Sequence, residues 1–193
     1  MGAIEILKRE ILSRGKGVLE KIAFRRRRYD GRVQDVCREV YDTGDAASIL
    51  LYDPARRCIL LVRQFRLPVY LATGRESTIE TCAGKLEGME AARRIVMEVE
   101  EETGFTIREP KFLFSAFMSP AAYAERISFF SAPYSAADRR SSGGGLYDEG
   151  EDIEIVEPGL EEALAMIDRG EIIDAKTIIL LQYAKLLGLI ERR

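Results

Sequence analysis

Three glutamates, Glu98, Glu101 and Glu102, are spaced so that one face of a helix would carry all three. At about 100° per residue they fall within an arc of about 100°. Like charges three and four residues apart destabilise a helix, whereas a divalent cation would turn that repulsion into ligation. The spacing therefore indicates a carboxylate metal site, against the plainer alternative of a solvated acidic face on an amphipathic helix.

The residue types that are missing narrow the chemistry further. The chain contains no histidine, which excludes serine–histidine–aspartate triads, cysteine–histidine dyads and histidine-ligated zinc. Its three cysteines, Cys37, Cys58 and Cys82, cannot all pair, and no C-x-x-C motif occurs. Reduced, buried thiols are therefore expected in place of a disulfide framework or a zinc ribbon. Acid–base chemistry and metal ligation must fall mainly to carboxylates.

The overall composition is that of one globular domain with a small appended arm. The chain has 193 residues, of which 47% are hydrophobic and 32% charged, and this excludes a disordered, collagen-like or coiled-coil protein. No apolar run approaches the ~20 residues of a membrane span. Glu5 falls where a signal peptide would need its apolar core. We therefore expect a cytoplasmic protein with no membrane partner.

The charge balance argues against nucleic acid as a partner. Basic and acidic residues number 29 and 32, for a net charge of −3, which is too close to neutral for a general nucleic-acid binder. A run of four arginines at 25–28 stands out. In a strand, alternate arginines would point to opposite faces. A solvated or inter-subunit strand is favoured over contact with nucleic acid or phosphate.

Hydrophobic periodicity and turn residues predict the elements that must position the glutamates. A helix is expected over 89–103, ended by Gly104, with two more helices at 159–170 and 175–193. Residues 2–12 fit a short amphipathic helix or turn, 67–78 a polar loop and 135–150 a mobile loop. Strands fill most of the remainder, including a hairpin around the turn at 53–56 and a short strand at 79–84. This order predicts an α+β sandwich.

The glutamate helix and the glycine before it resemble a known motif. Eight residues match the pattern G-x5-E-x7-R-E-U-x-E-E-x-G-U of the Nudix box, where U is aliphatic: Gly84, Glu90, Glu98, Val99, Glu101, Glu102, Gly104 and Phe105. Two departures matter. One residue is missing between Glu90 and Glu98, and Met97 replaces the arginine that in the family orients a metal-binding glutamate. Arg94, one turn before Glu98, is our hypothesis for its replacement.

Other segments resemble the ADP-ribose and GDP-mannose hydrolase branch of the Nudix family. The run 63–66 is similar to its R-Q-[YF]-R, and 79–84 to the E-x-x-A-G that leads into the box. Residues 118–120 followed by Glu125 are similar to its S-P-G-x-x-x-E segment, with Ala121 in place of glycine. Two segments resemble the GDP-mannose branch in particular: the glycine triplet at 143–145 with the acidic run 151–154, and the D-A-K-T at 174–177.

This resemblance implies a fold, an activity and an assembly. The fold is the Nudix α/β/α sandwich with mixed β-sheets, in which residues 1–45 form an N-terminal β arm that dimerises and 46–193 form the hydrolase domain. The activity is Mg²⁺-dependent hydrolysis, with Mn²⁺ as the alternative ion. The substrate is a nucleoside diphosphate sugar, GDP-mannose-like first and ADP-ribose second, and the products are a nucleoside monophosphate and a sugar phosphate. The alternative is a catalytically weak Nudix-fold nucleotide-binding or regulatory protein, motivated by Met97 and the shortened box.

The resemblance also assigns roles to individual residues. The metal ligands are expected to be Glu98 and Glu102, with Glu101 as a neighbouring ligand or catalytic orienting group and the carbonyl of Ala83 as a further ligand. The general base is expected in the loop 143–152, as Glu151 in preference to Glu149; the alternative is a polar loop tip. Substrate contacts are assigned to four residues: Arg63, Arg66, Glu80 and Glu125. For Arg63 and Arg66 the alternative is a solvent-facing basic pair, and for Glu80 it is a surface ion pair.

Overall fold

The computed structural model describes residues 4–190, and the side chains of all of these except Glu149. By its internal contacts the chain forms two compact units. The first contains the chain up to Asp45 together with Phe117–Arg126. The sequence pattern does not set Phe117–Arg126 apart from the residues on either side of it. The second contains Ala46–Ala116 and the chain from Ile127 onward. The roles expected for residues 1–45 and 46–193 stay predictions.

The first unit is built on a three-stranded antiparallel sheet of long strands, β1 (Glu5–Arg14), β2 (Val18–Arg27) and β3 (Val33–Asp42). The helix or turn predicted for 2–12 is therefore wrong from Glu5 onward, and residues 2 and 3 lie outside the described part. Pairing with β2 overrides the helical spacing. Two register shifts, between Ile6 and Lys8 and between Ile11 and Ser13, fit the clustered apolar residues into the ladder as bulges.

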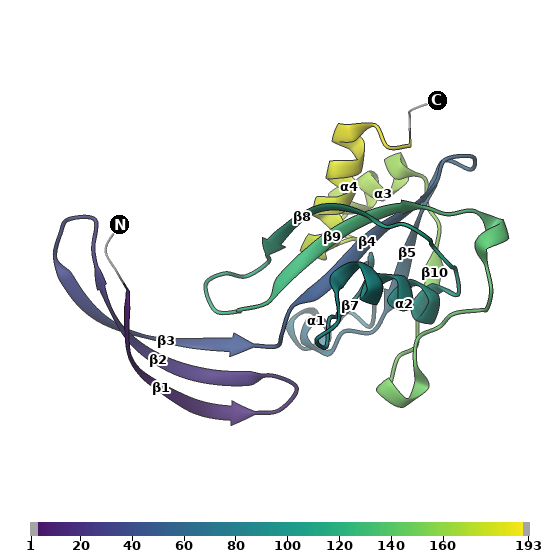
Figure 1. Ribbon diagram of the computed structural model, residues 1–193. Helices are drawn as coiled ribbons and strands as arrows, with labels where there is room; N and C mark the ends of the chain where they lie inside the picture. Colours follow the sequence, from purple (N-terminus) through teal and green to yellow (C-terminus); the bar gives the residue numbers. More distant parts are fainter. Residues whose placement is uncertain (1–3, 191–193) are drawn as a thin grey trace. The chain divides into compact units, whose positions relative to one another are not determined.

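The second unit is built on a mixed sheet with strand order β10-β5-β4-β9-β8 (Figure 1). The predicted hairpin around 53–56 is confirmed, since β4 pairs antiparallel with β5 from Leu51 to Asp53. On its other side β4 runs parallel to β9. The bounds of these strands are β4 (Ala46–Asp53), β5 (Cys58–Gln64), β8 (Lys111–Phe117), β9 (Arg126–Pro133) and β10 (Glu154–Val156).

The strand predicted at 79–84 is split into two. β6 (Thr78–Glu80) pairs with β5, whereas β7 (Cys82–Lys85) pairs with β4. Thr81 lies between them and belongs to neither strand. The chain therefore changes its hydrogen-bonding partner at Thr81, directly before the residues that the sequence marks as a metal-binding turn.

Four α-helices accompany this sheet. The predicted helix at 89–103 is confirmed as α2 (Ala91–Thr103), and the two C-terminal helices as α3 (Leu160–Asp168) and α4 (Ala175–Leu187). The loop expected at 67–78 is partly wrong, because α1 (Leu67–Thr73) begins there with Pro68 in its first turn and ends at a left-handed Gly74. Short 3₁₀ turns occur at η1 (Ala136–Asp138) and η2 (Tyr147–Glu149).

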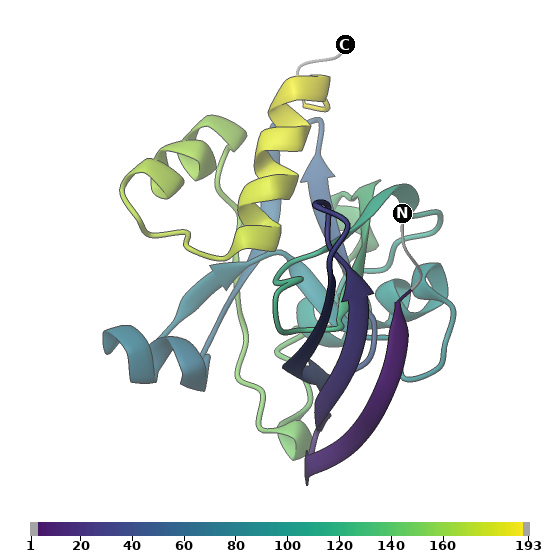
Figure 2. The ribbon, with the colours of Figure 1, turned by 90° about the vertical axis from the view of Figure 1, so that its left-hand side faces the viewer.

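The helices lie on both faces of the sheet, with α2 on one face and α3 and α4 on the other (Figures 1 and 2). Alternation along β4 supports both faces: Ile49 and Leu51 pack in one cluster with Ile95 and Val99 of α2. On the opposite face Phe114 of β8 contacts the ring of Tyr183 in α4, at a centroid distance of 5.2 Å. The predicted α+β sandwich is confirmed.

Within residues 4–190 no helix is both long and apolar enough to cross a membrane.

Candidate active site

Helix α2 turns two carboxylates inward beside its apolar face. Glu90 caps the helix, since its side chain accepts hydrogen bonds from the backbone N–H groups of Ala92 and Arg93. Ile95 and Val99 are fully buried in the core. Glu98 and Glu102 follow on the adjoining strip of the helix and are only 7% and 2% exposed. The acidic face is thus a buried feature, which the solvated alternative does not describe.

Arg94 pairs with two glutamates of the acidic helix, and its replacing the box arginine stays a hypothesis. Its Nη2 lies 2.5 Å from Oε1 of Glu98, and its Nη1 lies 3.7 Å from Oε2 of Glu101. Its Nε donates a hydrogen bond to the carbonyl of Lys85, at 3.2 Å. Arg94 therefore ties the first buried carboxylate of α2 to the end of β7, in the geometry that the hypothesis of its replacing the box arginine requires.

Gly84 is required because the carboxyl group of Glu98 lies against its backbone. A Cβ at this position would overlap the Glu98 carboxyl group, and nothing about the backbone angle demands glycine here. Gly84 belongs to β7 and is preceded directly by Ala83. The missing side chain therefore lets α2 bring a carboxylate onto the backbone of the turn, as a shared metal site needs.

Both buried carboxylates have a raised pKa, and one of their oxygens has no partner. Burial, with repulsion from Glu101 and Glu151 and despite Arg94, raises the pKa of Glu98 to about 7. Burial, with repulsion from Glu98 and Glu151, raises the pKa of Glu102 to about 8. Oε2 of Glu102 is buried and has no hydrogen-bond partner. A group of acids held in this state favours a positive charge beside it.

The ligand types of these residues suit a divalent cation, although the side chains do not surround an ion in their present positions. Carboxylate oxygens and a backbone carbonyl are the ligands that Mg²⁺ and Mn²⁺ prefer. Among the side chains that the structure describes, no three candidate ligands stand close enough together to enclose an ion as they are. Mg²⁺ typically keeps several waters and is completed by substrate phosphates, so an open set of ligands suits it.

Cys82 lies under the same carboxylates as a neutral thiol. It is fully buried and its side chain is hydrogen-bonded to Glu102. Burial, together with the negative charge of Glu102, raises the pKa of the thiol well above its usual value. Cys82 therefore acts as a packed hydrogen-bond donor, in line with the reduced, buried state expected from the sequence. Cys58 is a buried free thiol as well, whereas the burial expected for Cys37 is wrong, because Cys37 lies exposed on β3.

The glycine triplet docks onto the C-terminal end of α2. The N–H of Gly144 donates to the carbonyl of Glu102 at 2.9 Å, and that of Gly145 to the carbonyl of Glu101 at 3.1 Å. Gly143 has a φ of +66°, and a Cβ there would lie 2.5 Å from the carbonyl carbon of Thr103. The sequence predicts mobility from these glycines, but the structure uses them for close approach and for capping the helix.

This docking brings Glu151 to the acidic helix. Oε2 of Glu151 accepts a hydrogen bond from the N–H of Leu146, at 2.8 Å. The charge of Glu151 is felt by both Glu98 and Glu102, whose pKa values it helps to raise. Of the two candidate bases, Glu151 is therefore near enough to interact electrostatically with Glu98 and Glu102, whereas the side chain of Glu149 lies outside what the structure describes.

The two ends of the same loop are tied together. Tyr134 follows β9, and its hydroxyl donates to Glu157, which follows β10, at 2.5 Å. Arg56 donates to the same carboxylate at 2.6 Å and to the buried Asp53 at 2.6 Å. The loop that carries Glu151 is thus anchored at its base and at its glycines.

Arg66 and Glu80 form a second buried charge cluster. Nε and Nη2 of Arg66 donate to the two oxygens of Glu80 at 2.9 and 3.0 Å, and Nζ of Lys176 donates to Oε2 of Glu80 at 2.7 Å. Burial alone would raise the pKa of Glu80, but Lys176 and Arg66 outweigh it and lower the pKa to about 2. Glu80 is therefore ionised and buried, which excludes the surface ion pair as its description.

The remaining predicted site residues lie elsewhere. Arg63 pairs with Glu154 across the β5–β10 ladder, at 2.7 Å. Glu125 belongs to the segment that groups with the first unit, where it accepts a hydrogen bond from the hydroxyl of Thr43 at 3.4 Å. Their roles in substrate binding stay predictions.

Sequence reasoning missed Lys176 and the docking of the glycine loop. Lys176 falls in the D-A-K-T segment, which was noted only as a resemblance. That segment begins a helix. Asp at an N-cap is a recognisable signal in a sequence, so the start of this helix, with Lys176 in its first turn, could have been predicted. The docking of 143–145 had no such signal, since positive φ and close approach are tertiary properties.

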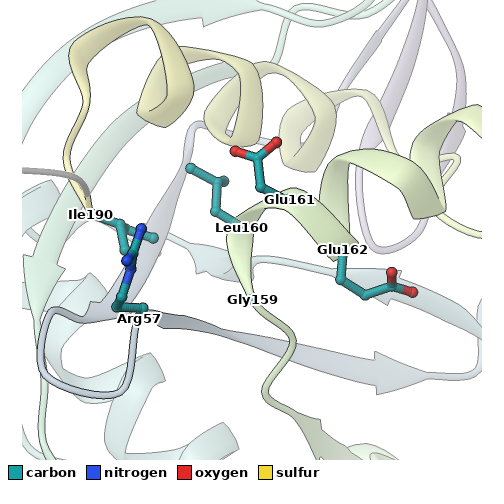
Figure 3. A pocket seen from close by; sticks show the side chains of 6 residues that line it. All are labelled: Arg57, Gly159, Leu160, Glu161, Glu162 and Ile190. Carbon is teal, nitrogen blue, oxygen red and sulfur yellow. The ribbon is translucent and has the colours of Figure 1, made fainter.

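A pocket of about 160 Å³ lies at the start of α3 (Figure 3), and the carboxylates that line it pair with neighbouring side chains. In Figure 3 the carboxylate of Glu162 points away from Arg57. Glu161 pairs with Lys185 at 2.6 Å and Glu162 with Arg169 at 2.6 Å. Its two carboxylates are already paired, so the candidate site remains the acidic helix and the turn beneath it.

The sequence of this chain is similar to a known family model and to several known proteins. Residues 3–41 match the model of the GDP-mannose pyrophosphatase NudK N-terminal domain. The chain is 44% identical over 187 residues to a GDP-mannose pyrophosphatase of Pectobacterium atrosepticum, covering 96% of this chain and 95% of the relative. It is 43% identical over 190 residues to one of Escherichia coli O157:H7, covering 97% and 98%.

A solved structure shares the fold. It is described as an ADP compounds hydrolase, and it superposes with a TM-score of 0.72 over 96% of this chain and 95% of its own, at 18% identity. At this identity the likeness shows the fold, and the residues of the site must be argued from this chain.

The raised pKa of Glu102 predicts an unusual pH dependence for the metal-free protein. Because the folded-state pKa lies at about 8, above its unfolded value, the folded protein binds the extra proton and its stability falls as the pH rises toward 8. Glu102→Gln removes this dependence. In EDTA at pH 9 we expect the variant to be more stable than the parent by roughly 1–3 kcal/mol, with little difference at pH 5.

Chemical unfolding at both pH values measures this, and Glu100→Gln, an exposed change on the same helix, is the matched control. At pH 9, Mg²⁺ should stabilise the parent and Glu100→Gln but not Glu102→Gln. A Glu102→Gln variant less stable than the parent at pH 9 without metal would contradict the unpaired burial of this carboxylate.

The docking of the glycine loop predicts different costs for alanine at two glycines of similar backbone angle. Gly143 (φ +66°) would meet the backbone of α2, whereas Gly150 (φ +73°) has open space around it. Both substitutions carry the strain of a positive φ. We expect Gly143→Ala to cost about 1–3 kcal/mol more in unfolding free energy than Gly150→Ala. Equal costs would mean that the loop does not dock as described.

Proposed function

This chain belongs to the GDP-mannose pyrophosphatase family of Nudix hydrolases, and on that premise we propose that it hydrolyses the diphosphate of a nucleoside diphosphate sugar. GDP-mannose is the first candidate substrate and ADP-ribose the second. The products are a nucleoside monophosphate and a sugar phosphate. The relatives that carry the name of GDP-mannose pyrophosphatase align over nearly their whole length, which supports extending that activity to this chain.

One observation carries the proposal at the level of the site: a buried carboxylate oxygen, Oε2 of Glu102, has no partner. Glu98 and Glu102 would hold a divalent cation with the carbonyl of Ala83, and Glu101 beside them. The cation, Mg²⁺ with Mn²⁺ as the alternative, would neutralise diphosphate oxygens and acidify a bound water. Phosphoryl transfer needs such neutralisation and positioning more than it needs a covalent nucleophile.

The chain's own groups supply the remaining functions. Arg94 orients Glu98 through its 2.5 Å contact and so takes over from the missing box arginine. Arg66, oriented by both oxygens of Glu80, presents its three remaining N–H donors to an anion; guanidinium groups suit phosphate oxygens. Glu151 accepts the proton of the attacking water, with Glu149 as the alternative base.

We also propose that the protein is a homodimer, with the arm of residues 1–45 making the contact. The match to the NudK N-terminal domain covers residues 3–41 of this arm. Four large apolar side chains of β1 are exposed by 41–49%, Ile6, Leu7, Ile11 and Leu12, and a strand this apolar favours a covering partner. All three cysteines are free thiols, which supports the expected cytoplasmic location.

The activity is tested by hydrolysis of a panel in Mg²⁺, in Mn²⁺ and in EDTA, with products identified by mass. The panel holds GDP-mannose, ADP-ribose, other nucleotide sugars, dinucleoside polyphosphates and nucleoside triphosphates. We expect metal-dependent release of a monophosphate and a sugar phosphate. Glu102→Gln should lower kcat/KM by roughly 100-fold or more, because a ligand to the catalytic ion is worth several kcal/mol, whereas Glu100→Gln should leave it unchanged.

Binding of nucleotides without turnover of any member of the panel would contradict the proposal. That result would favour the alternative of a catalytically weak nucleotide-binding or regulatory protein, and Met97→Arg would then test whether the departure from the box causes the loss. Hydrolysis that persists in EDTA would contradict the metal site instead.

The dimer is tested by light scattering of the full chain at micromolar concentration. A charge at the apolar strip, Ile11→Glu, should raise the dimer dissociation constant by roughly 10-fold or more, since it would bury an unpaired carboxylate. Ser13→Glu, on the same exposed strand, is the control and should change it little. A monomeric parent protein, or equal effects of both variants, would refute the arm as the contact.

A further inference from the structure

The break between β6 and β7 is stabilised by a hydrogen bond to helix α4, which lies outside the sheet. Glu80 ends the strand that pairs with β5, and Cys82 begins the strand that pairs with β4. The N–H of Thr81, between them, is fully buried and donates to a side chain of α4: Oγ1 of Thr177 accepts it at 2.7 Å. A buried N–H without a partner is costly, so this contact replaces the missing ladder hydrogen bond.

Thr177 is itself fixed at the first turn of α4. Its hydroxyl donates to Oδ2 of Asp174 at 2.6 Å, and its own N–H donates to the same oxygen at 3.0 Å. Asp174 is the N-cap of the helix. The only proton of the Thr177 hydroxyl is thereby committed to a carboxylate, which leaves its lone pairs for Thr81.

A second hydroxyl fixes the other side of the break. Oγ of Ser48, on β4, donates to the carbonyl of Cys82 at 3.2 Å and lies 2.9 Å from Oγ1 of Thr81. Since the Ser48 proton goes to the carbonyl, Thr81 must donate to Ser48. The hydroxyl protons of Ser48, Thr81 and Thr177, residues that are all 0% exposed, are thus all committed, and Thr81 is joined to Thr177 through its N–H. One ordered series of hydrogen bonds therefore runs from Asp174 through Thr177, Thr81 and Ser48 to the backbone of Cys82.

We propose that Thr177 is a positioning residue for the metal-binding turn, which it fixes through Thr81. The proposal rests on the role given above to the carbonyl of Ala83 and to Gly84. Ala83 lies two residues beyond the N–H that Thr177 holds, and Gly84 is the surface on which the Glu98 carboxyl group rests. A turn released at Thr81 would shift both by a fraction of an ångström, and ligand geometry for Mg²⁺ tolerates little displacement.

Lys176, the residue before Thr177, makes a similar contact with the same segment. Lys176 holds Glu80, immediately before the break, while Thr177 holds Thr81 within it. Two consecutive residues of α4 thus anchor two consecutive residues at the break, Glu80 and Thr81. Thr177 is the sharper probe, because its hydroxyl can be removed without leaving a buried charge.

The test compares Thr177→Val, which keeps the shape and removes the hydroxyl, with Thr177→Ser, which keeps the hydroxyl. Mn²⁺ affinity is measured by calorimetry or electron paramagnetic resonance, and exchange of the Thr81 amide is measured by hydrogen–deuterium exchange. We expect Thr177→Val to weaken Mn²⁺ binding 5- to 20-fold and to speed exchange of the Thr81 amide at least 10-fold. Thr177→Ser should lie within 2-fold of the parent in both.

Thr106→Val is the control for loss of a partly buried threonine hydroxyl elsewhere, since Oγ1 of Thr106 only contacts the carbonyl of Asp138, at 3.2 Å. It should leave metal binding unchanged. In turnover, Thr177→Val should raise the Mg²⁺ concentration for half-maximal rate by the same 5- to 20-fold while kcat at saturating Mg²⁺ falls by less than 3-fold. A general loss of structure would not produce this division.

Unchanged Mn²⁺ affinity with an unchanged Thr81 amide in Thr177→Val would overturn the inference, as would equal weakening by Thr106→Val or failure of Thr177→Ser to restore binding. If Thr177→Val does not fold, Ser48→Ala, which releases the Cys82 carbonyl, must weaken Mn²⁺ binding at least 3-fold or the inference fails. A parent protein that hydrolyses nothing would refute the proposed function, while metal affinity and amide exchange would still decide the role of Thr177.

Discussion

The burial of two carboxylates, one of which has an oxygen without a partner, is the constraint on which the site depends. Glu98 and Glu102 lie between the core face of α2 and the backbone of β7, and each has a pKa raised mainly by burial. Water cannot solvate the free oxygen of Glu102. A protein that keeps such groups loses folding stability at neutral pH unless a cation balances them. The need for a cation is therefore built into the packing.

Several features of the sequence follow from this constraint. Gly84 must lack a side chain because Glu98 occupies that space. The carbonyls at the end of α2 receive the N–H groups of Gly144 and Gly145, so the last turn, which carries Glu101 and Glu102, is capped by the loop that brings Glu151. The same glycine contacts therefore stabilise the helix and add a further negative charge beside it.

The sequence predicted the acidic helix well and the surrounding connections less well. Glutamate spacing and Gly104 were enough to define α2, because both signals are local. Arg94 could be proposed for the same reason, since i,i+4 neighbours on a helix meet whatever the tertiary structure. Residues 5–14 were misread because pairing with β2, with bulges at two places, determines their structure, and a partner strand is not visible in a local pattern.

The break at Thr81 was beyond local reasoning for a similar cause. Residues 79–84 look like one short strand, and only the competition between β5 and β4 for its edges divides them. The glycines of 143–145 likewise suggested freedom, whereas their φ angles and close contacts show a docked segment. In both places the deciding interaction joins residues about 40 to 100 positions apart.

Two buried glutamates, Glu80 at the end of β6 and Glu102 in α2, have opposite electrostatic states, and the difference explains how the site is divided. Glu80 has Arg66 and Lys176 as permanent counter-ions, which hold its pKa at about 2. It is an ionised, fully partnered anchor, and losing one cation would leave a buried charge at a cost of several kcal/mol. Glu102 has no such cation, and its pKa stands at about 8.

An anchor that is already neutralised does not compete for a metal ion, so a cation entering this region is directed to Glu98 and Glu102. Arg66 stays beside Glu80, which orients its guanidinium group. Its charge would then be available to an anionic substrate. In the proposed function, metal and guanidinium would therefore approach the diphosphate from separate carboxylates. This separation requires that Glu80 and the turn after it keep their places, and the first turn of α4 holds both.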